Sequence, residues 1–304
     1  MHVLASRRFP GPAWEELHEV EYGPLPLEPR EDVEAIAVVG ETIDASILDR
    51  LPNLKVVANY GVGYDGIDVE GLRRRGVAVT NTPGVLDAAT ADLTLALILA
   101  VRRRVVEGDR LVRSGEWGSG WEESYLVGDD LAGATLGIVG LGRIGTAVAR
   151  RARGFELRLL YTRRSRLAVE EERELGIEYR ELDDLLAEAD IVTLHVPLTP
   201  ETHGLIDARR LALLRDGACL VNAARGQIVG EPALVAELAS GRIRAGLDVF
   251  ADEPVVPAEL LSLPNVVLTP HVGSATRETR EAMTRVLVDN LLAAEAGRPL
   301  PNTV

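Results

Sequence analysis

Short apolar runs alternate with amphipathic stretches along the whole chain. In the first third these runs occupy residues 2–6, 35–40, 55–61 and 77–82, and a helical pattern follows from about Leu86 to Arg104. A second series occupies residues 134–140, 157–162, 190–196, 218–222, 245–250 and 265–271. Helical patterns such as residues 181–189 and 231–240 fill the gaps. This alternation predicts an α/β fold with parallel sheets, and its two series predict two domains.

Three segments of the chain lead to further expectations. The last periodic segment, about 277–297, reads as a helix that stops at Gly297 before Pro299 and Pro301. The most apolar stretch, residues 93–101, is too short to cross a membrane and predicts a buried helix. No run near the N-terminus resembles a signal peptide, so we expect a cytoplasmic protein.

Charge and cysteine content exclude several classes of function. The net charge of −14 has no basic tail or stripe to offset it, which argues against nucleic-acid and membrane partners. A single cysteine, Cys219, permits neither an internal disulfide nor a cysteine metal cluster. No group of residues has metal-ligand spacing, and no Gly-x-Ser-x-Gly elbow is present, so we expect neither a metal site nor a serine hydrolase.

A glycine motif marks a candidate dinucleotide site. Gly140, Gly142 and Gly145 follow an apolar strand and open an amphipathic helix. In this pattern the first glycine permits a tight turn, the second lets a pyrophosphate approach the backbone, and the third lets the helix pack on the strand. The pyrophosphate would lie at the helix N-terminus. An ordinary strand–helix turn is the alternative.

The end of the next strand carries arginines where many dinucleotide-binding proteins have a carboxylate. Arg163, Arg164 and Ser165 stand there. A carboxylate would bind the adenosine ribose and repel a 2′-phosphate, whereas two arginines and a hydroxyl favour that phosphate. The segment therefore predicts a preference for NADP, with NAD still possible. A solvated basic loop is the alternative.

Residues for hydride-transfer chemistry follow three predicted strands of the second series. Arg225 and Glu253 come after residues 218–222 and 245–250, and His271 ends residues 265–271, at the edge where open α/β sheets bind ligands. A cation can bind an oxo acid, and a histidine held by a carboxylate can deliver a proton near neutral pH. Taken singly, each residue could equally be a surface or turn residue.

Characteristic motifs occur along essentially the whole chain in one order, at residues 59–70, 79–100, 111–117, 137–145, 195–202, 222–226, 245–250 and 268–276. With these motifs the chain resembles the D-isomer-specific 2-hydroxyacid dehydrogenases, and most closely the glyoxylate/hydroxypyruvate reductases of that family.

The resemblance implies roles for individual residues. Arg225 would bind the substrate carboxylate and carbonyl, His271 would donate the proton, and Glu253 would orient it. Backbone N–H groups of Val62 and Gly63 would also bind the carboxylate. The implied cofactor contacts are Gly140, Leu141, Gly142, Arg143, Ile144, Gly145, Arg163, Arg164, Ser165, Ala223, Asp248, His271 and Gly273. Among these, Asp248 would meet the nicotinamide carboxamide.

The resemblance also implies an architecture. A flavodoxin-like substrate domain, residues 1–95 and 285–304, would be interrupted by an inserted Rossmann-type coenzyme domain, residues 96–284. Members are usually homodimers paired through the coenzyme domains and the segment around 100–130. Trp121 and Tyr125 occupy the region from which an aromatic can reach the partner's site, or they pack at the interface.

Three departures from the family pattern stand out. Gly230 stands where relatives commonly have Asp, which we expect to affect a helix start more than chemistry. Arg163 and Arg164 resemble the NADP-using reductases more than the NAD-using majority. Because the sequence ends at Val304, we expect it to lack the regulatory domain of many phosphoglycerate dehydrogenases.

The expected function is NADPH-dependent reduction of glyoxylate and hydroxypyruvate to glycolate and D-glycerate. D-3-phosphoglycerate dehydrogenase without a regulatory domain is a rival, for which Arg7 and Arg8 could bind the substrate phosphate. Formate or phosphite oxidation is a weaker rival. A cofactor-sensing binding protein without turnover is an alternative from a different class.

Overall fold

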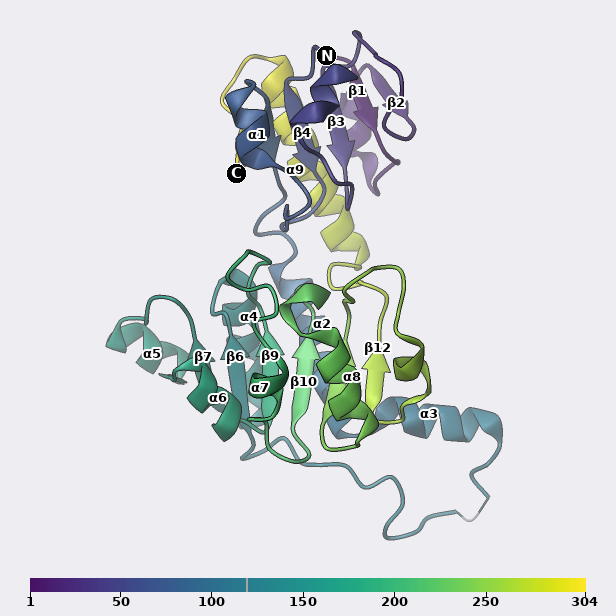
Figure 1. Cartoon of the computed structure of the whole chain (residues 1–304), viewed down its shortest axis with the longest axis vertical. Coiled ribbons are helices and arrows are strands. Elements are labelled where there is room, and N and C mark those ends of the chain that lie inside the picture. Colours follow the sequence, from purple (N-terminus) through teal and green to yellow (C-terminus); the bar gives the residue numbers. More distant parts are fainter. Residues whose placement is uncertain (119) are drawn as a thin grey trace. The chain divides into compact units, whose positions relative to one another are not determined.

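The chain forms two compact units, which Figure 1 shows in a computed structural model. The structure describes residues 1–118 and 120–304. Unit 1 consists of residues Met1–Leu86 and Ser274–Val304, and unit 2 consists of Asp87–Gly273. Both boundaries lie earlier in the chain than the sequence predicted, one at the first residue of a helix and the other in the loop before a helix.

Two long helices explain these boundaries. Helix α2 (Asp87–Arg102) packs against strands and a helix of unit 2, so its first turns belong to that unit. Helix α9 (Arg277–Glu295) contacts unit 1 from its first turn, where the Tyr60 hydroxyl donates to the Arg280 carbonyl at 2.7 Å. Each of these helices belongs as a whole to one unit. The amino-acid composition does not change where the helices begin, so the sequence did not indicate the boundaries.

Unit 1 is built on a parallel sheet. Its strands are β1 (Val3–Ala5), β2 (Val20–Tyr22), β3 (Ala35–Val38), β4 (Val56–Asn59) and β5 (Ala78–Thr80). Their order is β2-β1-β3-β4-β5, which is the flavodoxin-like order. Short helices η1 (Pro12–Glu16), η2 (Ala45–Asp49) and α1 (Val69–Arg74) connect them, and α9 packs against β4 and η1.

In the described part of unit 2, a seven-stranded parallel sheet has the order β12-β11-β10-β9-β6-β7-β8. The strands are β6 (Thr135–Val139), β7 (Arg158–Thr162), β8 (Ile177–Tyr179), β9 (Ile191–Leu194), β10 (Cys219–Asn222), β11 (Arg244–Leu247) and β12 (Val266–Leu268). The connecting helices are α4 (Arg143–Ala152), η3 (Arg153–Phe155), α5 (Val169–Leu175), α6 (Leu182–Glu188), α7 (Ala208–Leu211), η4 (Gly226–Ile228), α8 (Glu231–Ala239) and η5 (Ala258–Ser262). This is a Rossmann-type sheet, and its order reverses between β6 and β9.

Alternate side chains of these strands enter two different cores. Leu159 and Tyr161 of β7 pack in the core that includes α2 and α4, whereas Leu160 packs in the core that includes α6 and α8. Successive strand residues point to opposite faces, so both faces of the sheet are covered. This explains why the central strands read as continuous apolar runs in the sequence.

Helix α3 (Val105–Ser114) has no buried residue. The segment that follows exposes further large apolar side chains, with Trp121 82% exposed. No helix among the described residues is long and apolar enough to cross a membrane. Residues 93–101 instead lie within α2, whose Leu97 and Ile98 are buried.

Candidate active site

The glycine turn between β6 and α4 has a different constraint at each glycine. Gly140 has φ +96°, and a Cβ there would lie 2.7 Å from the His195 carbonyl carbon. At Gly145 a Cβ would lie 2.2 Å from the carbonyl oxygen of Gly140. At Gly142 a Cβ would meet nothing within 4 Å. The first and third glycines are therefore needed for packing, and the second leaves the backbone open to a ligand.

The start of α4 has the features of an anion site. Gly142 is its N-cap and supplies no side-chain cap, and the first N–H groups of a helix have no partner within it. Leu141 is buried beneath the turn, Ile144 is half-buried, and Arg143 is exposed. Unpaired N–H groups at a helix N-terminus favour anions, and the predicted pyrophosphate contact at this turn stays a prediction.

The arginine loop begins beside this turn, because the Gly140 N–H donates to the Thr162 carbonyl at the end of β7 at 3.0 Å. Arg163, Arg164 and Ser165 are exposed. A hydrogen bond to Thr199 and, to a smaller extent, the charge of Arg164 lower the pKa of Glu201.

The base of that loop is held by a buried network. The Tyr161 hydroxyl donates to Glu172 and accepts from the Leu167 N–H, both at 2.8 Å. Arg166 donates two hydrogen bonds to the same carboxylate at 2.8 Å each. The hydrogen bond from Arg166 lowers the pKa of Glu172. The loop is therefore fixed at its base, while its first two arginines project into solvent.

Arg225 lies in the turn between β10 and η4. The buried Asn222 side chain shapes this turn by accepting from the Ala224 N–H at 3.1 Å and donating to the Arg225 carbonyl at 2.8 Å. The half-buried guanidinium donates to the Ala224 carbonyl at 2.7 Å. Ala223, a predicted cofactor contact, is half-buried in the same turn.

Glu253 and His271 form the hydrogen-bonded pair that the chemistry requires. His271 Nδ1 lies 2.7 Å from Glu253 Oε2, and the Phe250 N–H donates to Oε1 at 3.0 Å. Burial opposes ionisation of Glu253, but the bonds from His271 and Phe250 and the charge of Arg225 hold its pKa below the usual value. All three predicted catalytic residues lie in unit 2, Glu253 and His271 in contact and Arg225 in the turn after the neighbouring strand β10.

Asp248 organises the loop that carries His271. Its carboxylate accepts from the Thr269 hydroxyl at 2.6 Å and from the N–H groups of Val272 and Gly273 at 2.8 and 2.9 Å. Its carbonyl accepts from the His271 N–H at 2.8 Å. Asp248 has no exposed surface, and burial raises its pKa against these hydrogen bonds. These contacts hold His271 at φ +51°, while the expected contact of Asp248 with nicotinamide stays a prediction.

In unit 1, the loop with Val62 and Gly63 follows β4. Asn59 donates to the carbonyls of Gly61 and Gly63 at 3.1 and 2.9 Å, and Asn81 donates to the Val62 carbonyl at 2.9 Å. These bonds fix the peptide orientation of the loop whose N–H groups are predicted to bind a carboxylate.

Asn59, Asn81 and Asn222 were missed by the sequence reasoning. Each is a buried amide at or just after a strand end, and that position was the available signal. Gly230 is the N-cap of α8 and makes no side-chain cap, so its departure from the family pattern affects a helix start. Among the described residues, no group of His, Cys, Asp and Glu could hold a metal ion.

Comparison with known proteins gives consistent matches. The model for the NAD binding domain of D-isomer specific 2-hydroxyacid dehydrogenases matches residues 95–273. The glyoxylate reductase of Pyrococcus furiosus is 50% identical over 306 aligned positions, which cover 99% of this chain and 90% of that enzyme.

Solved structures agree along the full length. A crystal structure of a protein from Thermus thermophilus has 47% identity and a TM-score of 0.92, with all of both chains covered. The NADPH-dependent glyoxylate/hydroxypyruvate reductase of Sinorhizobium meliloti, solved with NADP and malonate, has 37% identity and a TM-score of 0.89. That match covers 100% of this chain and 96% of the other.

Proposed function

This chain belongs to the family of D-isomer specific 2-hydroxyacid dehydrogenases, and from that premise we propose that it reduces glyoxylate and hydroxypyruvate with NADPH. As a member, it is an NAD(P)-dependent enzyme that acts on small hydroxy or oxo acids. The proposed products are glycolate and D-glycerate. The observation that carries the proposal is the His271–Glu253 pair, 2.7 Å apart, beside Arg225.

Three residues of the chain have different roles in the proposed reaction. A nicotinamide coenzyme, when bound, would supply the hydride for the 2-oxo carbon. Arg225 binds the substrate carboxylate and polarises the carbonyl oxygen. His271 donates a proton to that oxygen, and Glu253 accepts a hydrogen bond from Nδ1 and thereby directs Nε2 toward the substrate. A proton relay of this kind suits an alcohol–ketone interconversion and would serve no purpose in formate oxidation.

The proposal includes two further contacts with ligands. The N–H groups of Val62 and Gly63, in a loop fixed by Asn59 and Asn81, bind the substrate carboxylate. Arg163 and Arg164 bind the 2′-phosphate of NADPH, which is supported by their exposure and by the bond that joins the end of β7 to the glycine turn.

We also propose that the protein is a homodimer. Helix α3 buries none of its residues, although Val105 and Val112 are 55% and 58% exposed, and Trp121 follows with 82% exposed. Apolar side chains gathered on one segment are typical of an interface. Sedimentation should give twice the mass of 32.8 kDa, and Trp121→Ala should shift the equilibrium toward monomer.

The first experiment compares four substrates with each of two coenzymes. The purified protein is mixed with glyoxylate, hydroxypyruvate, pyruvate or 3-phosphohydroxypyruvate, and oxidation of NADPH or NADH is followed. Glyoxylate or hydroxypyruvate should give the highest kcat/KM, with NADPH preferred. His271→Ala should abolish turnover while NADPH still binds.

Each rival function predicts a different result in this assay. A lead for 3-phosphohydroxypyruvate would favour phosphoglycerate dehydrogenase, for which exposed Arg7 and Arg8 follow β1. Binding of NADPH without turnover on any acid would favour a cofactor sensor.

A further inference from the structure

We propose that Gln227 and Glu231 are positioning residues that set the catalytic pair against Arg225, an inference that rests on the proposed function. Both act on one peptide unit, Ala251, in the loop after β11. The Ala251 N–H donates to Glu231 Oε1 at 3.1 Å, and the Ala251 carbonyl accepts from Gln227 Nε2 at 2.5 Å. Two side chains from the segment after Arg225 therefore hold both polar groups of a residue next to the catalytic loop.

We call Gln227, Glu231 and their two hydrogen bonds to Ala251 the clamp. The backbone contacts around Ala251 show which segments the clamp joins. A Cβ on Gly226 would lie 2.0 Å from the Phe250 carbonyl carbon, so the turn after Arg225 lies directly against the loop. On the same loop, the Phe250 N–H donates to Glu253 at 3.0 Å. The clamp thus fixes the loop that orients Glu253 to the turn that carries Arg225.

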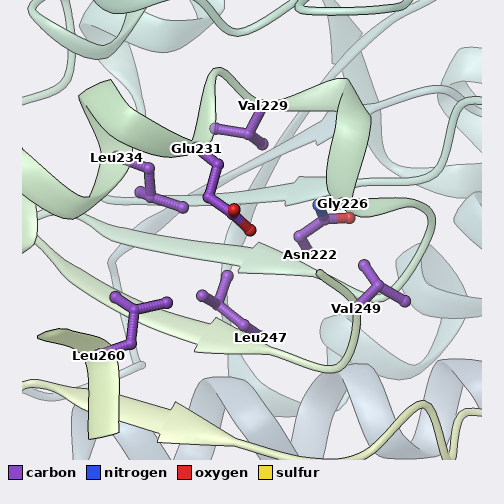
Figure 2. Close-up of a pocket in the computed structure, with 8 residues that line it drawn as sticks. All are labelled: Asn222, Gly226, Val229, Glu231, Leu234, Leu247, Val249 and Leu260. Atoms are coloured by element: carbon purple, nitrogen blue, oxygen red, sulfur yellow. The ribbon is translucent and has the colours of Figure 1, made fainter. Parts of the chain in front are cut away.

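Figure 2 shows the Glu231 carboxylate pointing into a small cavity between α8 and the strands. The cavity is lined by Asn222, Gly226, Val229, Leu234, Leu247, Val249 and Leu260, and its volume is about 10 Å³. That space is at the lower limit for one water molecule. Because most of the lining is aliphatic, few polar partners compete with Ala251 for the carboxylate.

A simpler role for Glu231 is stabilisation of α8 by a negative charge at its first residue. The two roles differ in what they need. Helix stabilisation needs the charge, whereas the clamp needs only an oxygen that accepts from Ala251. Glu231→Gln removes the charge and keeps an acceptor of the same shape, so this variant separates them.

The test compares Glu231→Leu, Gln227→Leu and Glu231→Gln in the full-length protein. Glu237→Leu is the matched control, because Glu237 lies on the same helix and its carboxylate bonds Arg242 at 2.6 Å instead. Displacements of about 1 Å in a catalytic site can cost roughly a hundredfold in rate. We expect both clamp Leu variants to lose about ten- to a hundredfold in kcat with glyoxylate, with Kd for NADPH within about twofold. Glu231→Gln and the control should stay within about threefold.

Hydrogen exchange gives a readout that does not depend on turnover. In both clamp Leu variants the amides of Ala251 and Phe250 should exchange faster, the latter because Glu253 no longer holds it. Undiminished protection of Phe250, unchanged kcat in either Leu variant, or an equal loss in Glu231→Gln would overturn the clamp. Absence of turnover in the unchanged protein would refute the proposed function, and Phe250 exchange would still decide the clamp.

Discussion

Replacing Arg163 and Arg164 together by Ala should remove the preference for NADPH over NADH. Both residues are exposed. Arg166 and Tyr161 hold the base of the loop through Glu172, so the double substitution should leave the backbone in place. The change therefore addresses the phosphate contact and little else.

The magnitude follows from the two charge-assisted contacts that are lost. At the low end, suited to exposed groups, each is worth roughly 1.5 kcal/mol, or about 3 kcal/mol together. With tenfold per 1.4 kcal/mol, the ratio of kcat/KM for NADPH to that for NADH should fall about a hundredfold. Most of the change should appear as a higher KM for NADPH.

The assay measures initial rates with glyoxylate at saturating concentration, varying each coenzyme. Arg150→Ala with Arg173→Ala is the control, because it removes the same charge from exposed positions on α4 and α5. An unchanged ratio of kcat/KM for the two coenzymes in the Arg163/Arg164 variant would show that these arginines do not bind the 2′-phosphate. An equal fall in the control would show a general field effect in place of a phosphate contact.

Three further predictions follow from the same geometry. Gly145→Ala should destabilise the protein by roughly 1–3 kcal/mol through overpacking. Gly142→Ala should leave the melting temperature unchanged and weaken NADPH binding. Similar melting temperatures for the two variants would contradict this prediction. Glu253→Gln should lower kcat about a hundredfold and move the acidic limb of the pH profile, since the carboxylate stays ionised to below its usual pKa; an unaltered profile would contradict this. Burial lowers the pKa of His195 to about 4, so the unfolded chain takes up a proton near pH 6.5 that the folded protein does not. The free energy of unfolding should therefore fall as the pH drops from about 6.5 to 4, by at most about 1.4 kcal/mol per pH unit. The measurement is the melting temperature as a function of pH. If His195→Asn shows the same dependence on pH as the unchanged protein, His195 is not the cause.

The sequence predicted the central strands well and the edge strands poorly. β3 and β4 are fully buried and appear as continuous apolar runs. β2 and β8 were missed because each has three residues with a glutamate at the centre, and neither is fully buried. Edge strands of this kind have no periodic signature, and only pairing with a neighbour identifies them.

For the site, sequence reasoning found the residues but could not supply their contacts. Glu253 and His271 were expected at strand ends, yet their 2.7 Å separation depends on pairing between β11 and β12. The contacts of Gln227 and Asp248 with Ala251 and Val272 could not be predicted, because each joins a side chain to a backbone group of another segment. Such contacts depend on how the segments pack and leave no periodic pattern in the sequence.

The placement of the catalytic residues on successive parallel strands bears on how the enzyme acquires activity during folding. β10, β11 and β12 are neighbours in one parallel sheet, and each is followed by one member of the trio. Parallel neighbours cannot pair through a short hairpin, so each pairing must wait for a crossover connection to form. In a refolding experiment, recovery of helical signal should precede recovery of turnover, which begins only when β12 has joined the edge of the sheet.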